Sequence, residues 1–403
     1  MALLLLLAMA VLCRALTFAG LVRREGRSLL GRSGTAAIPG GLRRFGARRA
    51  AESAVPDLWK AGPAEVYTGQ AQKALYLMKE NPMLFDVTVE EELEVLREER
   101  EKEEEQKSAL EETTKEDTLV LRRRMDEVRQ NERARVVTEL LYLKVCNRFK
   151  NLAVPLVPPL KDGGDVKFGS IDLKGLTSDI YSKDALELVR EHLFRIIGQE
   201  VSSQSSLMGG AAVIQIALFQ AGQVYAMSSL FGYYLRRADA RYQLEKLAGS
   251  FGAWGEEAPA NSAPVEGAQS LKDYITSFGP EQVESMTTVA SLEAQMAMET
   301  QVTALFGDLK ALQIKLMNAL GMVSSNEEAT QKLQEAIQRK EVESLRITSD
   351  DLRRLVLEAV AYGSLLNDSE KQVDTIYELT PSSSRSTGYL TGDDTDEGRM
   401  LPG

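Results

Sequence analysis

Histidine and cysteine, the residues with which nucleophilic or metal chemistry most often begins, are scarce in this chain. It has one histidine, His192, and two cysteines, Cys13 and Cys146. A catalytic histidine needs a nucleophile or a carboxylate placed against it, and no motif pairs His192 with Cys146. These residues are also too few for a zinc site built from His and Cys. We therefore assign no catalytic, cofactor-binding or metal-binding residue, expect no cofactor, and interpret His192 as a partly exposed structural residue.

Charged residues are abundant and offer another kind of chemistry. The sequence has 48 Lys and Arg against 59 Asp and Glu, and an Arg–Glu network between helices could orient an anionic ligand. Paired carboxylates leave enzymatic activity undecided. Phosphate-binding glycine loops of the G-x-x-x-x-G-K-[ST] or G-x-G-x-x-G type do not occur at the end of a strand pattern. The candidates for an interaction surface or a pocket are Arg236, Arg237, Asp239, Arg241, Glu245 and Glu358.

Two segments that would position these residues read as copies of one helix. When Gly232 is aligned with Gly363, small and apolar residues recur in both segments at steps of three and four, which marks one buried face of an α-helix. We infer a duplicated helical module. The residues that define it are Gly232 and Gly363, Phe231 and Tyr362, and Leu235 and Leu366.

The remaining patterns are helical too, and they predict an all-α fold class. We expect two related helical modules in tandem, a long N-terminal amphipathic helix over 119–149, a flexible linker between the modules and disordered termini. A helix break is expected at Asn81-Pro82, and 90–112, with twelve glutamates, is expected to be a solvated acidic segment. The predicted parts are a presequence (1–50), an N-terminal helical region with the first module (71–247), a linker (248–270), a second module (271–379) and a tail (380–403).

The first 50 residues have the composition of a targeting segment. They contain nine arginines against one acid, Glu25, and begin with the apolar run 2–12, which is too short to span a bilayer. An arginine-rich, acid-poor leader predicts import into an organelle, and the apolar run suits a bipartite signal-plus-transit presequence for a plastid. A one-step transit peptide is the alternative. The rest of the chain is more acidic than the overall net charge of −11, which argues against nucleic-acid binding.

The segment 201–235 carries no charge and raises the question of a membrane. Its glutamines, serines and glycines would be costly in hydrocarbon, whereas a helix that is apolar nearly all round suits the centre of a bundle. We predict a buried helix and no transmembrane span, with peripheral membrane contact as the alternative.

Several stretches together resemble the plant UV-B-induced chloroplastic protein family. This family contains a duplicated domain of unknown function that also occurs in cyanobacteria. The resemblance implies a plastid location and supplies no catalytic residue. In the second copy Asn367-Asp368 replaces the Arg236-Arg237 pair. The stretches are 119–128 (LVLRRRMDEV), 131–133 (NER), 222–226 (GQVYA), 231–239 (FGYYLRRAD), 241–246 (RYQLEK) and 354–360 (RLVLEAV).

Three functions follow as hypotheses. The first is a stromal protein-interaction or regulatory factor associated with stress, which binds an unidentified plastid protein. The second is a small-anion-binding protein or an enzyme that uses Arg and Glu groups between the modules. The third is a protein that associates peripherally with the thylakoid or the envelope through 201–235.

Overall fold

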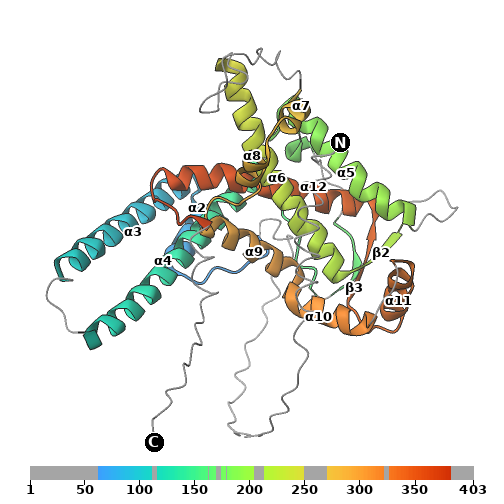
Figure 1. Cartoon of the computed structure of the whole chain (residues 1–403), viewed down its shortest axis with the longest axis horizontal. Coiled ribbons are helices and arrows are strands. Elements are labelled where there is room, and N and C mark those ends of the chain that lie inside the picture. Colours follow the sequence, from blue (N-terminus) through green and yellow to red (C-terminus); the bar gives the residue numbers. More distant parts are fainter. Residues whose placement is uncertain are drawn as a thin grey trace, which may run out of the picture. The chain divides into compact units, whose positions relative to one another are not determined.

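The structure of the chain is a computed structural model that describes most of the sequence between residues 62 and 382 (Figure 1). The described residues fall within one compact unit, 61–403. The predicted presequence (1–50) lies outside them, as do nearly all of the linker (248–270) and of the tail (380–403). The described ranges are 62–110, 116–161, 163–168, 174–177, 179–203, 213–248, 270–321 and 326–382.

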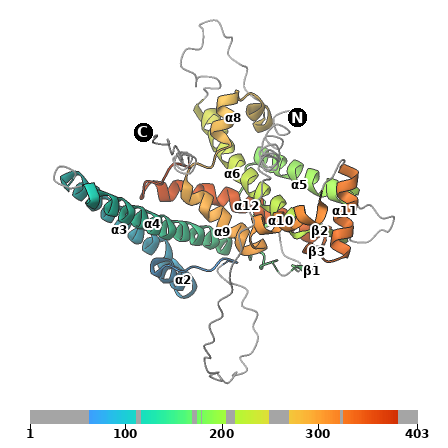
Figure 2. The same cartoon turned by 60° about the horizontal axis from the view of Figure 1, so that its bottom comes forward.

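The described residues are mainly helical, which confirms the predicted fold class. The predicted break at Asn81 separates the first two helices, and Pro82 begins the second, where its missing N–H costs nothing. The third helix returns beside the second (Figures 1 and 2), and Glu103 pairs with Arg129 and Arg133 between them. These helices are α2 (Gly69–Glu80), α3 (Pro82–Leu110) and α4 (Glu116–Asn151).

Side-chain caps fix where several of the later helices begin. The Oγ atoms of Ser270, Ser291 and Thr348 and the carboxylate of Asp308 each accept a backbone N–H of the first turn, as N-cap residues do. The helices that follow α4 are η2 (Lys174–Leu176), which is a short 3-10 helix, α5 (Lys183–Ser203), α6 (Leu218–Ala248), α7 (Leu271–Thr276), α8 (Pro280–Met286), α9 (Leu292–Phe306), α10 (Leu309–Leu320), α11 (Asn326–Gln338) and α12 (Ser349–Asp374).

A small sheet was not predicted. Its strands are β1 (Gly164–Val166), β2 (Val213–Ala217) and β3 (Ser344–Thr348), in the order β1-β3-β2; β3 is parallel to β1 and antiparallel to β2. The buried helix predicted within 201–235 therefore begins only at Leu218, after the strand β2. Strands of three to five residues are too short to show a clear alternation.

The two glycine-bearing helices, α6 and α12, pack against each other at the centre of the described unit, and each follows directly on a strand. The aligned face of α12 is buried throughout, and that of α6 is buried except at Val224 and Phe231, which are half-buried. A smaller apolar cluster joins α10 and α11 to the end of β2; its buried residues are Ala217, Leu316, Ala336, Ile337 and Val342.

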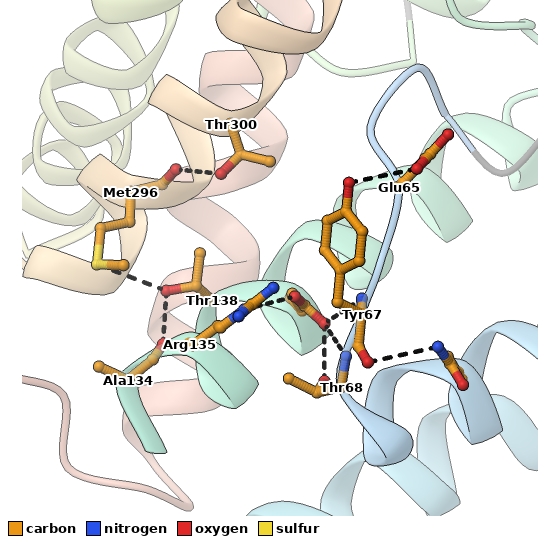
Figure 3. A network of polar contacts seen from close by, with 10 residues as sticks. Glu65, Tyr67, Thr68, Ala134, Arg135, Thr138, Met296 and Thr300 are labelled. Carbon is orange, nitrogen blue, oxygen red and sulfur yellow. Dashed lines mark hydrogen bonds and ion pairs between the residues drawn. The ribbon is translucent and has the colours of Figure 1, made fainter. Parts of the chain in front are cut away.

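The segment that leads into α2 is fixed to α4 by a buried carboxylate. Glu139 accepts hydrogen bonds from the backbone N–H groups of Tyr67 and Thr68 and from the Thr68 hydroxyl, at 3.0, 2.9 and 2.7 Å. Figure 3 shows these contacts, with Arg135 beside the Tyr67 ring and Thr138 facing Met296 of α9. One face of α4 thus holds the N-terminal segment while another meets the second copy.

The described residues contain no candidate for a membrane-spanning helix. Of the helices that the structure describes, none combines the length and the apolar character that crossing a bilayer requires. The described parts of the uncharged segment 201–235 belong to the end of α5, the strand β2 and the first half of α6. Peripheral contact with a membrane stays a prediction.

Candidate functional site

Gly232 and Gly363 mark the point where α6 and α12 cross. A Cβ atom on Gly232 would overlap the backbone carbonyl of Val360, and one on Gly363 would overlap that of Ser229. Ser229 and Val360 each precede the glycine of their own helix by three residues. The contact is therefore reciprocal, and only glycine permits backbones to approach this closely.

A buried hydroxyl reinforces the crossing from the second copy. Ser364 Oγ donates toward the carbonyl oxygens of Gly232, at 2.9 Å, and Val360, at 3.0 Å. The Tyr181 hydroxyl lies 3.2 Å from the same Oγ. The two copies thus share polar contacts as well as van der Waals contacts, in a region without access to water.

The arginine pair of the first copy is used within the molecule. Arg236 Nε donates to Asp368 Oδ1 at 2.8 Å, and its Nη1 donates to the Ile180 carbonyl at 3.1 Å. Arg237 Nη1 donates to the carbonyls of Thr288, at 2.7 Å, and Ser285, at 3.3 Å. The replacement of an arginine by Asp368 in the second copy thereby supplies the counter-ion for the first copy.

Asp239 of α6 connects this helix to the start of α5 in the first copy. Ser182 Oγ donates to Asp239 Oδ1 at 2.8 Å and accepts the backbone N–H of Ala185 at the start of α5. The aligned acid of the second copy, Glu370, does the same for α9, since it accepts the hydroxyl and the backbone N–H of Ser291.

Glu370 and Asp239 are equally buried, at 4% exposure, but Glu370 also accepts a hydrogen bond from the other copy. Tyr233 of the first copy donates its hydroxyl to Glu370 Oε2 at 2.5 Å, and burial raises the pKa of Glu370 above its ordinary value. Sequence reasoning missed Glu370 and Ser291. The alignment of Asp239 with Glu370 in the repeat was the signal that could have found them.

Arg241 and Glu245 form a separate pair near the end of α6. Arg241 Nε donates to Glu245 Oε1 at 3.1 Å, and the same oxygen accepts the Tyr274 hydroxyl of α7 at 2.6 Å. Burial and this hydrogen bond raise the pKa of Tyr274. Glu245 thus fixes α7 to α6. Arg241 Nε and Glu245 Oε1 are both already engaged in hydrogen bonds.

Glu358 lies in a different polar group from the other candidates. Its side chain is fully buried, and it accepts the backbone N–H of Val157 at 2.8 Å. The Tyr225 hydroxyl is 3.5 Å away and accepts Gln301 Nε2 at 3.0 Å. Burial raises the pKa of Glu358 to about 8. The structure brings Arg236 and Asp239 near the Ser182 turn but does not join Glu358 to either.

His192 occupies a structural position. Its ring stacks on Phe231, with centroids 4.2 Å apart, and its Nε2 lies 3.1 Å from Ser228 Oγ. Burial, together with Arg195, lowers the pKa of His192 to about 4. Cys146 is buried, which raises the pKa of its thiol to about 12. In the described residues no cluster of three or more His, Cys, Asp or Glu side chains could hold a metal ion.

A cavity that sequence reasoning missed lies between α3, α4 and the end of α12. It has a volume of about 490 Å³. Lys144 and Asn147 reach it from the inner face of α4, and both side chains are almost fully buried. Their place at helical spacing after Leu140 and Leu143, on an apolar stripe, was the available signal. The lining residues are Asp86, Glu90, Lys144, Asn147, Arg148, Asn151, Gln372, Thr375 and Ile376.

Comparison with known proteins places these features in a family context. A family model described as a protein of unknown function, DUF760, matches residues 120–248, which run from α4 to the end of α6. A UV-B-induced chloroplastic protein of Arabidopsis thaliana is 27% identical over 350 residues, which cover 78% of this chain and 77% of the relative. No solved structure was found to match. These findings confirm the resemblance of this chain to the UV-B-induced chloroplastic protein family.

Proposed function

We propose that this protein is a plastid protein-interaction factor and that the exposed face of α3 binds its partner. The observation that carries the proposal is a mixed apolar and acidic surface on that helix. Met83, Leu84, Val87 and Val95 are exposed, at 87%, 48%, 51% and 51%. Clustered exposed apolar side chains mark interaction sites.

Acidic side chains lie among these apolar residues at helical spacing. Glu91, Glu94 and Glu98 are exposed on the same face of α3, while the opposite face buries Phe85 and Leu93. A surface of this kind complements an amphipathic helix that carries basic residues beside its apolar face. We therefore propose a basic helical segment of another plastid protein as the partner.

The predicted candidates on α6 support this function less directly. Arg236, Arg237, Asp239, Arg241 and Glu245 each contact other residues of the chain. A partner that used them would have to compete with these contacts, whereas the apolar residues of α3 offer their surface at no such cost.

The location is part of the proposal. The printed name of the Arabidopsis relative calls that protein chloroplastic, and the basic leader of this chain is typical of plastid import. We propose the stroma. A fluorescent fusion to residues 1–50 that stays outside plastids would contradict it, and so would a mature protein recovered with washed membranes. A protein released by a high-salt wash would instead support the peripheral association through 201–235.

Affinity capture from plastid extract tests the interaction. The full chain as bait is compared with a Val87→Ser, Val95→Ser variant, and an Ile314→Ser, Met317→Ser variant is the matched control, since Ile314 and Met317 are exposed on α10 at 61% and 50%. We expect the α3 variant alone to lose a reproducible partner, and the capture to weaken at higher salt. Equal recovery by both variants would count against α3.

A further inference from the structure

We propose that the cavity between α3, α4 and α12 binds a small zwitterion of the amino-acid class, with an ammonium group and a carboxylate. This goes beyond the proposed interaction, which uses the outer face of α3. The cavity volume of about 490 Å³ lies in the range of small-molecule sites, and its lining is polar and charged.

Lys144 supplies the first argument. Its side chain is only 5% exposed, yet its ion pair with Asp86 spans 3.8 Å, beyond hydrogen-bonding distance. Within the described residues its ammonium group makes no hydrogen bond. A buried ammonium normally has close acceptors, because an uncompensated buried charge is costly. A ligand carboxylate would supply them.

Asn147 supplies the second, independent argument. It is 4% exposed and lines the same cavity, and its Oδ1 atom has no hydrogen-bond partner among the described residues. Such an orphaned acceptor is uncommon in a folded protein. A small rotation of the amide would turn this oxygen toward the cavity, where a ligand that offers both an acceptor and a donor could satisfy it together with Lys144.

The placement of charge selects a zwitterion. Lys144 and Arg148 lie one turn apart on α4, and Asp86 and Glu90 lie one turn apart on α3. A simple anion would face the two carboxylates, and a simple cation would face the two basic groups. A molecule that carries both charges pairs with each helix. Gln372 of α12 can add an amide contact on the third side.

Calorimetric titration of the full chain with glycine, L-serine and L-glutamine tests the proposal. Inorganic phosphate, n-butylamine and glycerol serve as anionic, cationic and neutral probes. We expect saturable binding of at least one amino acid, and none of the three other probes to bind or to displace it. Silence of all three amino acids, or displacement by phosphate as effective as by the amino acid itself, would overturn the assignment.

Variants connect binding to the cavity. Lys144→Met should weaken binding of the amino acid roughly tenfold or more, as loss of a charged hydrogen bond does. Asp86→Asn, at a side chain that is 57% exposed, should weaken it without disturbing the fold. Glu99→Gln, at an exposed position of α3 outside both the cavity and the proposed partner surface, is the control and should bind as the parent chain does. Unchanged binding in both cavity variants would refute the site. The outcome is independent of partner capture, because Val87 and Val95 do not line the cavity.

Discussion

The two copies of the strand–helix unit, β2–α6 and β3–α12, have the same order of elements but different side chains beside their contact. In both, a short strand leads into a long helix whose glycine meets the backbone of the other copy. At the next positions they differ, since Arg236 of the first copy faces Asp368 of the second. The two helices therefore complement each other at this position.

The two helices also differ in burial, since α12 is more deeply buried than α6. Tyr362 is fully buried and donates its hydroxyl to the Ala297 carbonyl, whereas the aligned Phe231 is half-buried and stacks on His192. The helix α12 contacts α4, α5, α6 and α9, so it is the central element. The resemblance between the copies is thus greatest at the glycine crossing.

The largest effect is expected at the crossing itself. Gly232→Ala and Gly363→Ala would each force a methyl group into a backbone carbonyl, and we expect a loss of about 4 kcal/mol or more in the free energy of unfolding. Gly198→Ala on α5 is the control, since its methyl group meets nothing within 4 Å and alanine favours a helix by about 0.5–1 kcal/mol. Urea denaturation measures all three. Small losses of unfolding free energy at both crossing glycines would contradict the close backbone approach at Gly232 and Gly363.

A second effect concerns the pH dependence of stability. The folded-state pKa of Glu358, about 8, is raised above the value in an unfolded chain. The contribution of this side chain to the free energy of unfolding is therefore fully present below the unfolded pKa and is lost as the pH rises through about 8. Each pH unit inside that window costs up to about 1.4 kcal/mol. Glu358→Gln cannot ionise, so its stability should fall less than that of the parent between about pH 6 and about pH 8, by about 2 kcal/mol. Parallel pH profiles from thermal unfolding would contradict the buried neutral acid.

Substitutions of Ser182 and Ser291, the N-cap residues of α5 and α9, allow the two copies to be compared directly. Ser291→Ala would remove a cap and a hydrogen bond to buried Glu370, and we expect a loss of about 2 kcal/mol in unfolding free energy. Ser182→Ala should lose about 1 kcal/mol, because Ser182 is only half-buried. The reverse order in urea denaturation would mean that the second copy does not hold its acid more tightly.

The smallest effect belongs to the ion pair between the copies. Arg236 and Asp368 retain 31% and 21% exposure, so solvent screens them. A double-mutant cycle with Arg236→Met and Asp368→Asn should give a coupling free energy of about 0.5–1 kcal/mol that declines with salt. A coupling free energy indistinguishable from zero at low salt would show that α6 and α12 do not complement each other at this position.

The helical class could be predicted because its signals are periodic and local, and the same periodicity is the basis of the predicted duplication. The apolar steps around Gly232 and Gly363 required no knowledge of tertiary contacts, and the break at Asn81 followed from proline. The sheet could not be found, since β2 and β3 are short and pair with distant residues. The domain division at 248–270 remains a prediction about the repeat, because the described parts of both copies lie within one unit.

The candidate site was harder to predict than the fold. The sequence indicated Arg236 and Asp239 as candidates but could not show that Asp368 and Ser182 would meet them, since such partners come from other elements. Glu358 is a candidate by its charge, whereas its burial beside Val157 and Tyr225 depends on the packing of three segments. Whether these residues serve a partner or a ligand stays a prediction.

The claim that the two copies form one reciprocal body is tested most directly by amide hydrogen exchange of the Gly232→Ala variant, followed by mass spectrometry. The substitution lies in α6, but its methyl group would displace the backbone of α12 at Val360. We predict that peptides from 218–248 and from 349–374 lose protection together and to a similar degree. Loss confined to α6, with α12 as protected as in the parent chain, would contradict the account.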